Sequence, residues 1–287
     1  MTVDVEDYFQ VQAFADHIPR SSWDSIPRRV EANIEAVLDL FETSQTTGTF
    51  FILGWIAERH PQMIRRIASA GHELASHGYD HKRADCLPPV AFREDIHRSK
   101  RVLEDIAALP VTGYRAPTFS IGRANQWAYE LLEGEGYTYS SSTYPIRHDL
   151  YGDTAAPRQP FRPGSGRLWE LPLTTRRLWG QNLPVAGGGY FRLLPYNLWR
   201  RNLVHLNRSN DAAIFYFHPW ELDPQQPRVP GINMRTRVRH YTNLQAMPDR
   251  LKQLLRDFRW RRMDQVFADL MDTSEASGHY LAPETTM

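Results

Sequence analysis

Two histidines four residues apart, His77 and His81, have the residue type and spacing of a metal-binding pair. The acidic cluster Asp4-Val5-Glu6-Asp7 precedes them in the chain. A divalent metal of the zinc type binds imidazole nitrogen and carboxylate oxygen, and a catalytic site uses three protein ligands and leaves a position for water. Two histidines and one acid are a sufficient set. Because the chain has 11 histidines, the pair could also arise by chance, so its context must decide.

Bulk composition indicates a globular protein. Of the 287 residues, 41% are hydrophobic and 23% are charged, which is close to the average for folded domains. The net charge of +1 argues against a nucleic-acid partner. No stretch approaches the roughly 18 apolar residues of a membrane span, so we expect no integral membrane segment. The single cysteine, Cys86, excludes an internal disulfide and is compatible with a reducing compartment.

The elements that must position the histidines alternate between short apolar runs and helical periods. Predicted strands cover residues 2–6, 48–54, 72–76, 111–115, 137–141, 168–173 and 212–217. Predicted helices cover residues 31–42, 56–70, 89–109 and 124–135. This alternation predicts parallel β/α architecture, in which chemistry lies at the carboxyl ends of the strands. Most candidate residues follow a predicted strand end.

Five motifs occur in a fixed order along the chain. They are Thr2-Val3-Asp4-Val5-Glu6-Asp7, Ser76-His77-Gly78-Tyr79-Asp80-His81, Arg115-Ala116-Pro117-Thr118-Phe119, Leu168-Trp169-Glu170-Leu171-Pro172 and Phe217-His218-Pro219-Trp220. The set resembles the NodB-homology polysaccharide deacetylases, carbohydrate esterase family four. It is most similar to the PEP-CTERM-associated subgroup of exopolysaccharide loci, which is related to the allantoinase-like and peptidoglycan-deacetylase branch.

The resemblance covers about residues 2–270 and implies an α/β fold, a distorted (β/α)7 barrel. We expect one deacetylase domain over residues 1–270, in which residues 144–189, rich in Pro, Gly and Arg, form a long loop insertion beside the site. Residues 271–287 are polar and without period, so we expect a mobile tail there.

The resemblance also implies a reaction and a set of roles. The reaction is hydrolysis of N-acetyl groups on the amino sugars of a polysaccharide or its precursor, with release of acetate and with a divalent metal, zinc first, as cofactor. His77 and His81 would bind the metal. Asp4 would act as the base and Arg115 would hold it, while His218 would protonate the leaving nitrogen because imidazole titrates near neutral pH.

The third metal ligand is open between Glu6 and Asp7. The common family pattern has two adjacent aspartates, whereas Val5 follows Asp4 in this chain. Successive side chains of a strand point to opposite faces, so Glu6 shares the face of Asp4. Parity therefore favours Glu6, and Asp7 stays possible if the strand ends at Val5.

Aromatic residues near the motifs are candidates for contact with the sugar. Phe119 follows Arg115 in the same loop, and Trp220 follows His218. Tyr190 and Phe191 would add an apolar platform. Aromatic residues near strand ends also pack in the core, and a core position is the alternative for these residues.

One position departs from the family pattern. An aspartate commonly follows the fifth strand and tunes the acid histidine, but this chain has Ser140 there. A serine cannot carry the negative charge that raises a histidine pKa. We therefore expect another carboxylate, Asp149, Asp153 or Glu170, to act on His218.

Two alternatives accompany the main interpretation. The first is a metal-independent amidohydrolase of the allantoinase-like branch, against which the intact histidine pair counts. The second is a non-catalytic carbohydrate-binding relic, since a fold does not guarantee activity. For location we expect a bacterial cytoplasm for the sequence as written, and export is possible if the true start lies upstream. The sequence does not indicate an oligomeric state.

Overall fold

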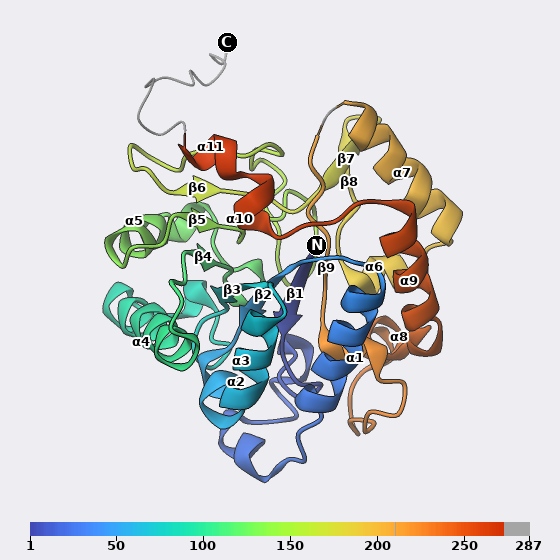
Figure 1. Ribbon diagram of the computed structural model, residues 1–287, viewed down its shortest axis with the longest axis horizontal. Helices are drawn as coiled ribbons and strands as arrows, with labels where there is room; N and C mark the ends of the chain where they lie inside the picture. Colours follow the sequence, from blue (N-terminus) through green and yellow to red (C-terminus); the bar gives the residue numbers. More distant parts are fainter. Residues whose placement is uncertain (210, 273–287) are drawn as a thin grey trace.

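The computed structural model describes residues 1–209 and 211–272, and a curled, all-parallel sheet of seven strands forms its centre (Figure 1). The strand order is β6-β5-β4-β3-β2-β1-β9. The strands are β1 (Thr2–Val5), β2 (Thr49–Ile52), β3 (Glu73–Ser76), β4 (Gly113–Tyr114), β5 (Tyr139–Ser140), β6 (Trp169–Glu170) and β9 (Tyr216–Phe217). Each lies within a predicted strand, and the predicted distorted (β/α)7 barrel is confirmed. The tail predicted from residue 271 lies, from residue 273 on, outside the described residues.

Helices cover the outside of the sheet between consecutive strands (Figure 1). They are α1 (Val30–Thr43), α2 (Gly54–Arg59), α3 (Pro61–Ser69), α4 (Pro89–Ala107) and α5 (Trp127–Gly134). The single helix predicted over residues 56–70 is divided into α2 and α3. His60 leaves the helical region, with φ −131° and ψ 53°, because the ring of Pro61 disfavours helical backbone in the residue before it.

The barrel wall is open between β6 and β9, and residues of the predicted insertion bridge the opening. Leu173, after β6, donates its N–H to the Thr143 carbonyl at 2.9 Å. The next residue, Thr174, accepts the N–H of Ile214, just before β9, at 2.6 Å. An antiparallel hairpin follows, formed by β7 (Thr175–Leu178) and β8 (Gln181–Pro184), and then α6 (Gly188–Leu193) and α7 (Tyr196–Arg208).

The C-terminal helices complete the structure. They are α8 (Met234–Tyr241), α9 (Met247–Asp257), α10 (Met263–Val266) and α11 (Ala268–Asp272). Met263 and Phe267 join the apolar cluster inside the barrel, and the Met263 N–H bonds to Thr49 Oγ1 at 2.7 Å. Thr49 begins β2, so this segment covers the amino ends of the strands and leaves the carboxyl ends accessible.

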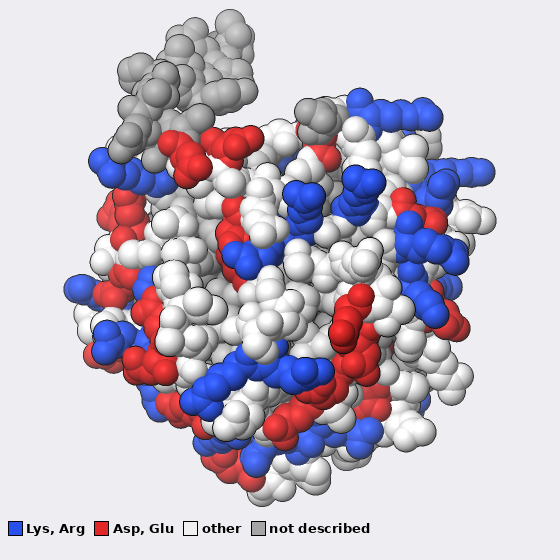
Figure 2. Space-filling model, viewed as in Figure 1, with Lys and Arg blue, Asp and Glu red and all other residues white. Residues whose placement is uncertain are grey.

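Basic and acidic side chains intermingle on the face shown in Figure 2, in keeping with the net charge of +1. Among the described residues, none of the helices combines the length and the apolar character needed to cross a bilayer.

Candidate metal and catalytic site

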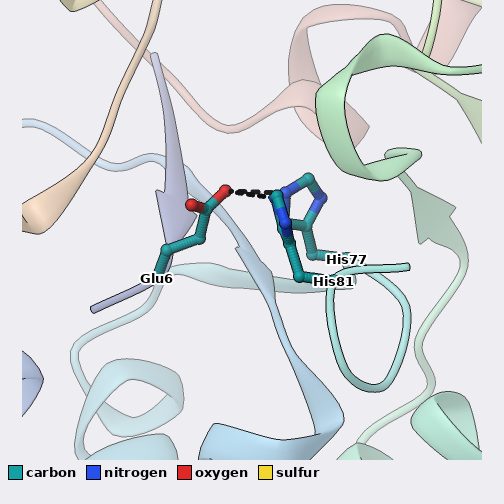
Figure 3. A group of neighbouring side chains, drawn as sticks. All are labelled: Glu6, His77 and His81. Carbon is teal, nitrogen blue, oxygen red and sulfur yellow. Dashed lines mark hydrogen bonds and ion pairs between the residues drawn. The ribbon is translucent and has the colours of Figure 1, made fainter. Parts of the chain in front are cut away.

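Glu6, His77 and His81 converge at the carboxyl ends of the strands (Figure 3). Glu6 directly follows β1, and the histidines lie in the loop after β3. Glu6 Oε1 is 3.2 Å from His77 Nε2 and 3.0 Å from His81 Nε2. All three side chains are buried, and their candidate ligand atoms lie within 4.8 Å of one another. The structure thus brings together the histidine pair and one carboxylate.

The loop that carries the histidines is fastened to α4. Gly78 and His81 both have positive φ, 74° and 59°, which lets the chain turn sharply enough for both imidazoles to face one point. The Tyr79 N–H bonds to Asp95 Oδ2 at 3.0 Å, and Ser99 Oγ donates to the Gly78 carbonyl at 2.8 Å. A Cβ at Gly78 would stand 2.9 Å from Asp95 Oδ2, so the loop lies against the helix too closely for a larger residue.

The orientation of His77 favours a cation between it and Glu6. Its Nδ1 lies 2.8 Å from the carbonyl oxygen of Arg115, an acceptor, so Nδ1 must donate. A neutral His77 therefore directs the lone pair of Nε2 toward the Glu6 carboxylate, and two acceptors face each other. Burial opposes ionisation of Glu6, but charge from His81 and His218 and a hydrogen bond from His81 act against it, and the pKa of Glu6 is lowered. The donor set fits a divalent metal of the zinc type.

Asp7 lies outside this group although β1 ends at Val5. Its Oδ2 accepts the N–H groups of Arg29 and Val30 at 2.7 and 3.1 Å, at the start of α1, and its Oδ1 accepts the Tyr8 N–H at 2.8 Å. Those bonds satisfy backbone donors that a helix start leaves free. Of the two acids left open by the sequence, the structure brings Glu6 to the histidines.

Asp4 and Arg115 form a buried ion pair beside the candidate metal ligands. Arg115 Nη1 lies 2.6 Å from Asp4 Oδ1, and the two side chains are 0% and 3% exposed. Arg115 also bonds to Thr2 Oγ1 at 2.8 Å, to the Ser141 carbonyl at 3.1 Å and to Ser141 Oγ at 3.0 Å. A guanidinium held by β1 and by Ser141, directly after β5, leaves the Asp4 carboxylate little freedom to rotate.

His218, directly after β9, lies between two carboxylates. Its Nε2 is 3.8 Å from Glu6 Oε1, and its Nδ1 is 3.8 Å from Glu221 Oε2. The imidazole stacks on Trp220 at a centroid distance of 5.0 Å. Burial lowers the pKa of His218, but Glu6, Glu221 and Asp4 more than compensate and raise it to about 9. The imidazole is therefore protonated at neutral pH in the metal-free site.

The carboxylate beside His218 is one that sequence reasoning missed. The three expected carboxylates bind elsewhere: Asp149 pairs with Arg239, Asp153 with Arg123, and Glu170 accepts the N–H groups of Ser142 and Thr143. Glu221 takes this place instead, held by Arg192 Nε at 3.1 Å. The sequence contained a signal for it. Glu221 follows His218 by three residues and accepts its backbone N–H at 3.1 Å, as in a capping box.

The predicted aromatic residues fall into three environments. Phe119 and Trp220 line a pocket of about 130 Å³ together with Asp4, Glu6, His77 and His81. Tyr190 is partly buried and lines an adjoining groove. Phe191 is fully buried against Trp199 and Phe215 in the core. Sequence proximity alone could not separate neighbouring residues 190 and 191.

Two known families match consecutive parts of the chain. Residues 20–139 match the family described as polysaccharide deacetylase, and residues 141–268 match a domain of unknown function, DUF3473. Residues 20–139 thus match a polysaccharide deacetylase domain, as the motifs predicted. His77, His81 and Arg115 lie in the first match and His218 lies in the second, so the candidate site draws on both.

Curated relatives are similar over parts of their length. A peptidoglycan deacetylase of Helicobacter pylori is 28% identical over 112 residues, 39% of this chain and 37% of that protein. A chitooligosaccharide deacetylase of Rhizobium leguminosarum bv. trifolii is 23% identical over 141 residues, 49% of this chain and 59% of that protein. The chain thus matches between about a third and three fifths of these two relatives.

One solved structure is similar over its whole fold. A protein from Mycobacterium smegmatis, assigned as a polysaccharide deacetylase, superposes with a TM-score of 0.65 at 21% identity, covering 100% of this chain and 93% of that one. At this identity the likeness concerns the fold.

Proposed function

We propose that this protein is a metal-dependent deacetylase that hydrolyses the N-acetyl group of an amino sugar in a polysaccharide or its precursor and releases acetate. The observation that carries the proposal is the convergence of Glu6, His77 and His81 in one pocket with Asp4 and His218. The match of residues 20–139 to a polysaccharide deacetylase domain and relatives named as peptidoglycan and chitooligosaccharide deacetylases support the substrate class.

Glu6, His77 and His81 would hold the metal, and their two nitrogens and one oxygen favour zinc. A divalent cation held there would act as a Lewis acid that lowers the pKa of water and polarises the acetyl carbonyl. Asp4 takes a proton from the attacking water, and Arg115 keeps the Asp4 carboxylate in place.

His218 completes the proton balance. The water oxygen bonds to the acetyl carbon, the C–N bond breaks, and His218 donates its proton to the nitrogen that leaves as the amine. The Glu221 carboxylate, 3.8 Å from Nδ1, favours the protonated form of the imidazole by its charge. Phe119 and Trp220 give the pocket the apolar surface that an acetyl methyl group requires.

Acetate release from N-acetylhexosamine oligomers tests the proposal. We expect zinc-loaded protein to turn over, His77→Ala to lose both zinc binding and activity, and Asp4→Asn to retain zinc but lose activity. His205→Ala is the matched control, because His205 is exposed on α7 outside the pocket. It should behave as wild type.

The alternatives predict different results in the same assay. A metal-independent amidohydrolase would keep its activity after chelation and in His77→Ala. A carbohydrate-binding relic would bind the oligomer without releasing acetate in any metal-loaded form. Either result would reject the proposed mechanism.

A further inference from the structure

A larger groove adjoins the catalytic pocket. It encloses about 900 Å³ and shares His148, Tyr151, Tyr216 and Arg239 with the pocket that contains Asp4 and Glu6. The two spaces therefore lie side by side. A sugar unit placed with its acetamido group at the metal ligands therefore has room for a neighbouring unit in the groove.

The groove carries an excess of positive charge. Arg147, Arg235 and Arg239 line it with a single carboxylate, Asp149. Asp149 lies 3.3 Å from Arg235 and 3.0 Å from Arg239, so it compensates one of three cations. Arg147 is exposed, and among the described residues its side chain makes no hydrogen bond or ion pair. Two positive charges stay uncompensated although the chain as a whole is nearly neutral.

Helix α8 presents two of these cations in a fixed arrangement. Arg235 and Arg239 are one helical turn apart and lie on the groove side. Arg237 is also exposed on the same helix but does not line the groove. Arg235 and Arg239 therefore line the groove, and Arg237 on the same helix can serve as a control outside it.

Apolar and aromatic side chains complete the groove. Leu193 and Tyr190 come from α6, and Met234 and Val238 come from α8. Leu193, Met234 and Val238 are 43%, 69% and 48% exposed, which is unusual for such residues unless something covers them. A pyranose ring offers C–H faces to apolar side chains, while charged groups on the ring would meet the arginines.

We propose that this groove binds an anionic group, a carboxylate or a phosphate, carried by the substrate next to the sugar that is deacetylated. The inference rests on the proposed function for the placement of the acetylated sugar. The negative charge of the ligand is inferred from the arginines, because a planar guanidinium can donate two parallel hydrogen bonds to two oxygens of a carboxylate or phosphate. The substrate class is thereby an acidic polysaccharide or a sugar phosphate precursor, rather than a neutral chitin-like chain.

Binding measured by isothermal titration calorimetry tests the groove without any need for turnover. The probes are a hyaluronan tetrasaccharide, which alternates N-acetylglucosamine with glucuronate, its neutral methyl ester, and N-acetylglucosamine 1-phosphate. We expect wild type to bind the acid at least about threefold more tightly than the ester, the range for partly exposed charge pairs. The difference should shrink as salt is raised.

Charge-neutralising variants assign the effect to the groove. Arg147→Gln with Arg235→Gln should remove the preference for the acid, while Arg237→Gln should keep it. Preference for the glucuronate probe alone indicates an acidic polysaccharide, and preference for the phosphate alone indicates a precursor. Equal binding of acid and ester together with equal binding of N-acetylglucosamine 1-phosphate and N-acetylglucosamine, or equal loss in Arg237→Gln, refutes the proposal.

Acetate release from the same probes separates this proposal from the proposed function. Anion-dependent binding without acetate release would uphold the groove and reject the deacetylase. Acetate release without anion-dependent binding of any probe would uphold the deacetylase and reject the groove.

Discussion

Replacing Arg115 by methionine should destabilise the protein far more than breaking a surface ion pair. Methionine has similar length and no charge, so the variant leaves the Asp4 carboxylate without a cation. Removing one partner of a buried pair costs about 3–5 kcal/mol, whereas exposed pairs contribute about 0.2–1 kcal/mol. The exposures of 0% for Arg115 and 3% for Asp4 place the pair in the first class. We therefore expect Arg115→Met to lose about 3–5 kcal/mol of unfolding free energy.

Urea unfolding followed by far-UV circular dichroism measures this loss. The matched control is Arg66→Met, because Arg66 pairs with Glu35 at 2.9 Å while the two side chains are 53% and 46% exposed. We expect the control to lose less than about 1 kcal/mol. A second variant, Arg115→Met with Asp4→Leu, removes both charges and should recover part of the loss.

The reasoning is refuted if Arg115→Met and Arg66→Met lose similar amounts. It is also refuted if the double variant is no more stable than Arg115→Met, because the cost would then come from lost packing rather than from an unpaired carboxylate.

Three further predictions concern the metal, pH and the acid histidine. Chelation should lower the melting temperature and added zinc should restore it. At a hundredfold excess of zinc over Kd the unfolding free energy should rise by about 2.7 kcal/mol, and His81→Ala should show no such gain. Burial raises the pKa of Glu73 to about 7, so its contribution is fully present below pH 4.5 and lost as pH rises toward 7. Glu73→Gln should flatten the fall in unfolding free energy over that range by about 3 kcal/mol, and an unchanged slope contradicts the assignment. A Cβ at Gly188 would lie 1.8 Å from Glu221 Oε2, so Gly188→Ala should displace Glu221 and lower kcat by up to about a hundredfold with the circular dichroism spectrum unchanged. Unaltered kcat would show that the Glu221 charge does not act on His218.

Much of the barrel could be predicted because its signals are local. The apolar face of Ile34, Val37, Leu38 and Phe41 indicated α1, and all four are buried. Short apolar runs indicated every strand of the parallel sheet. The hairpin of β7 and β8 carried no such signal, since its exposed, polar strands lack apolar alternation and depend on each other for pairing.

The sequence by itself determined which residue types were available and roughly where along each strand they occur: the histidine pair, the acids after β1, Arg115 and His218. Tertiary structure decided which of them meet. It turned Glu6 toward the histidines while Asp7 bonds to the start of α1, and it placed Glu221 beside His218 in place of the three expected carboxylates. Strand and helix periods follow from neighbouring residues, whereas a site depends on distances between residues such as Asp4 and Arg115, 111 positions apart, that the folded backbone alone sets.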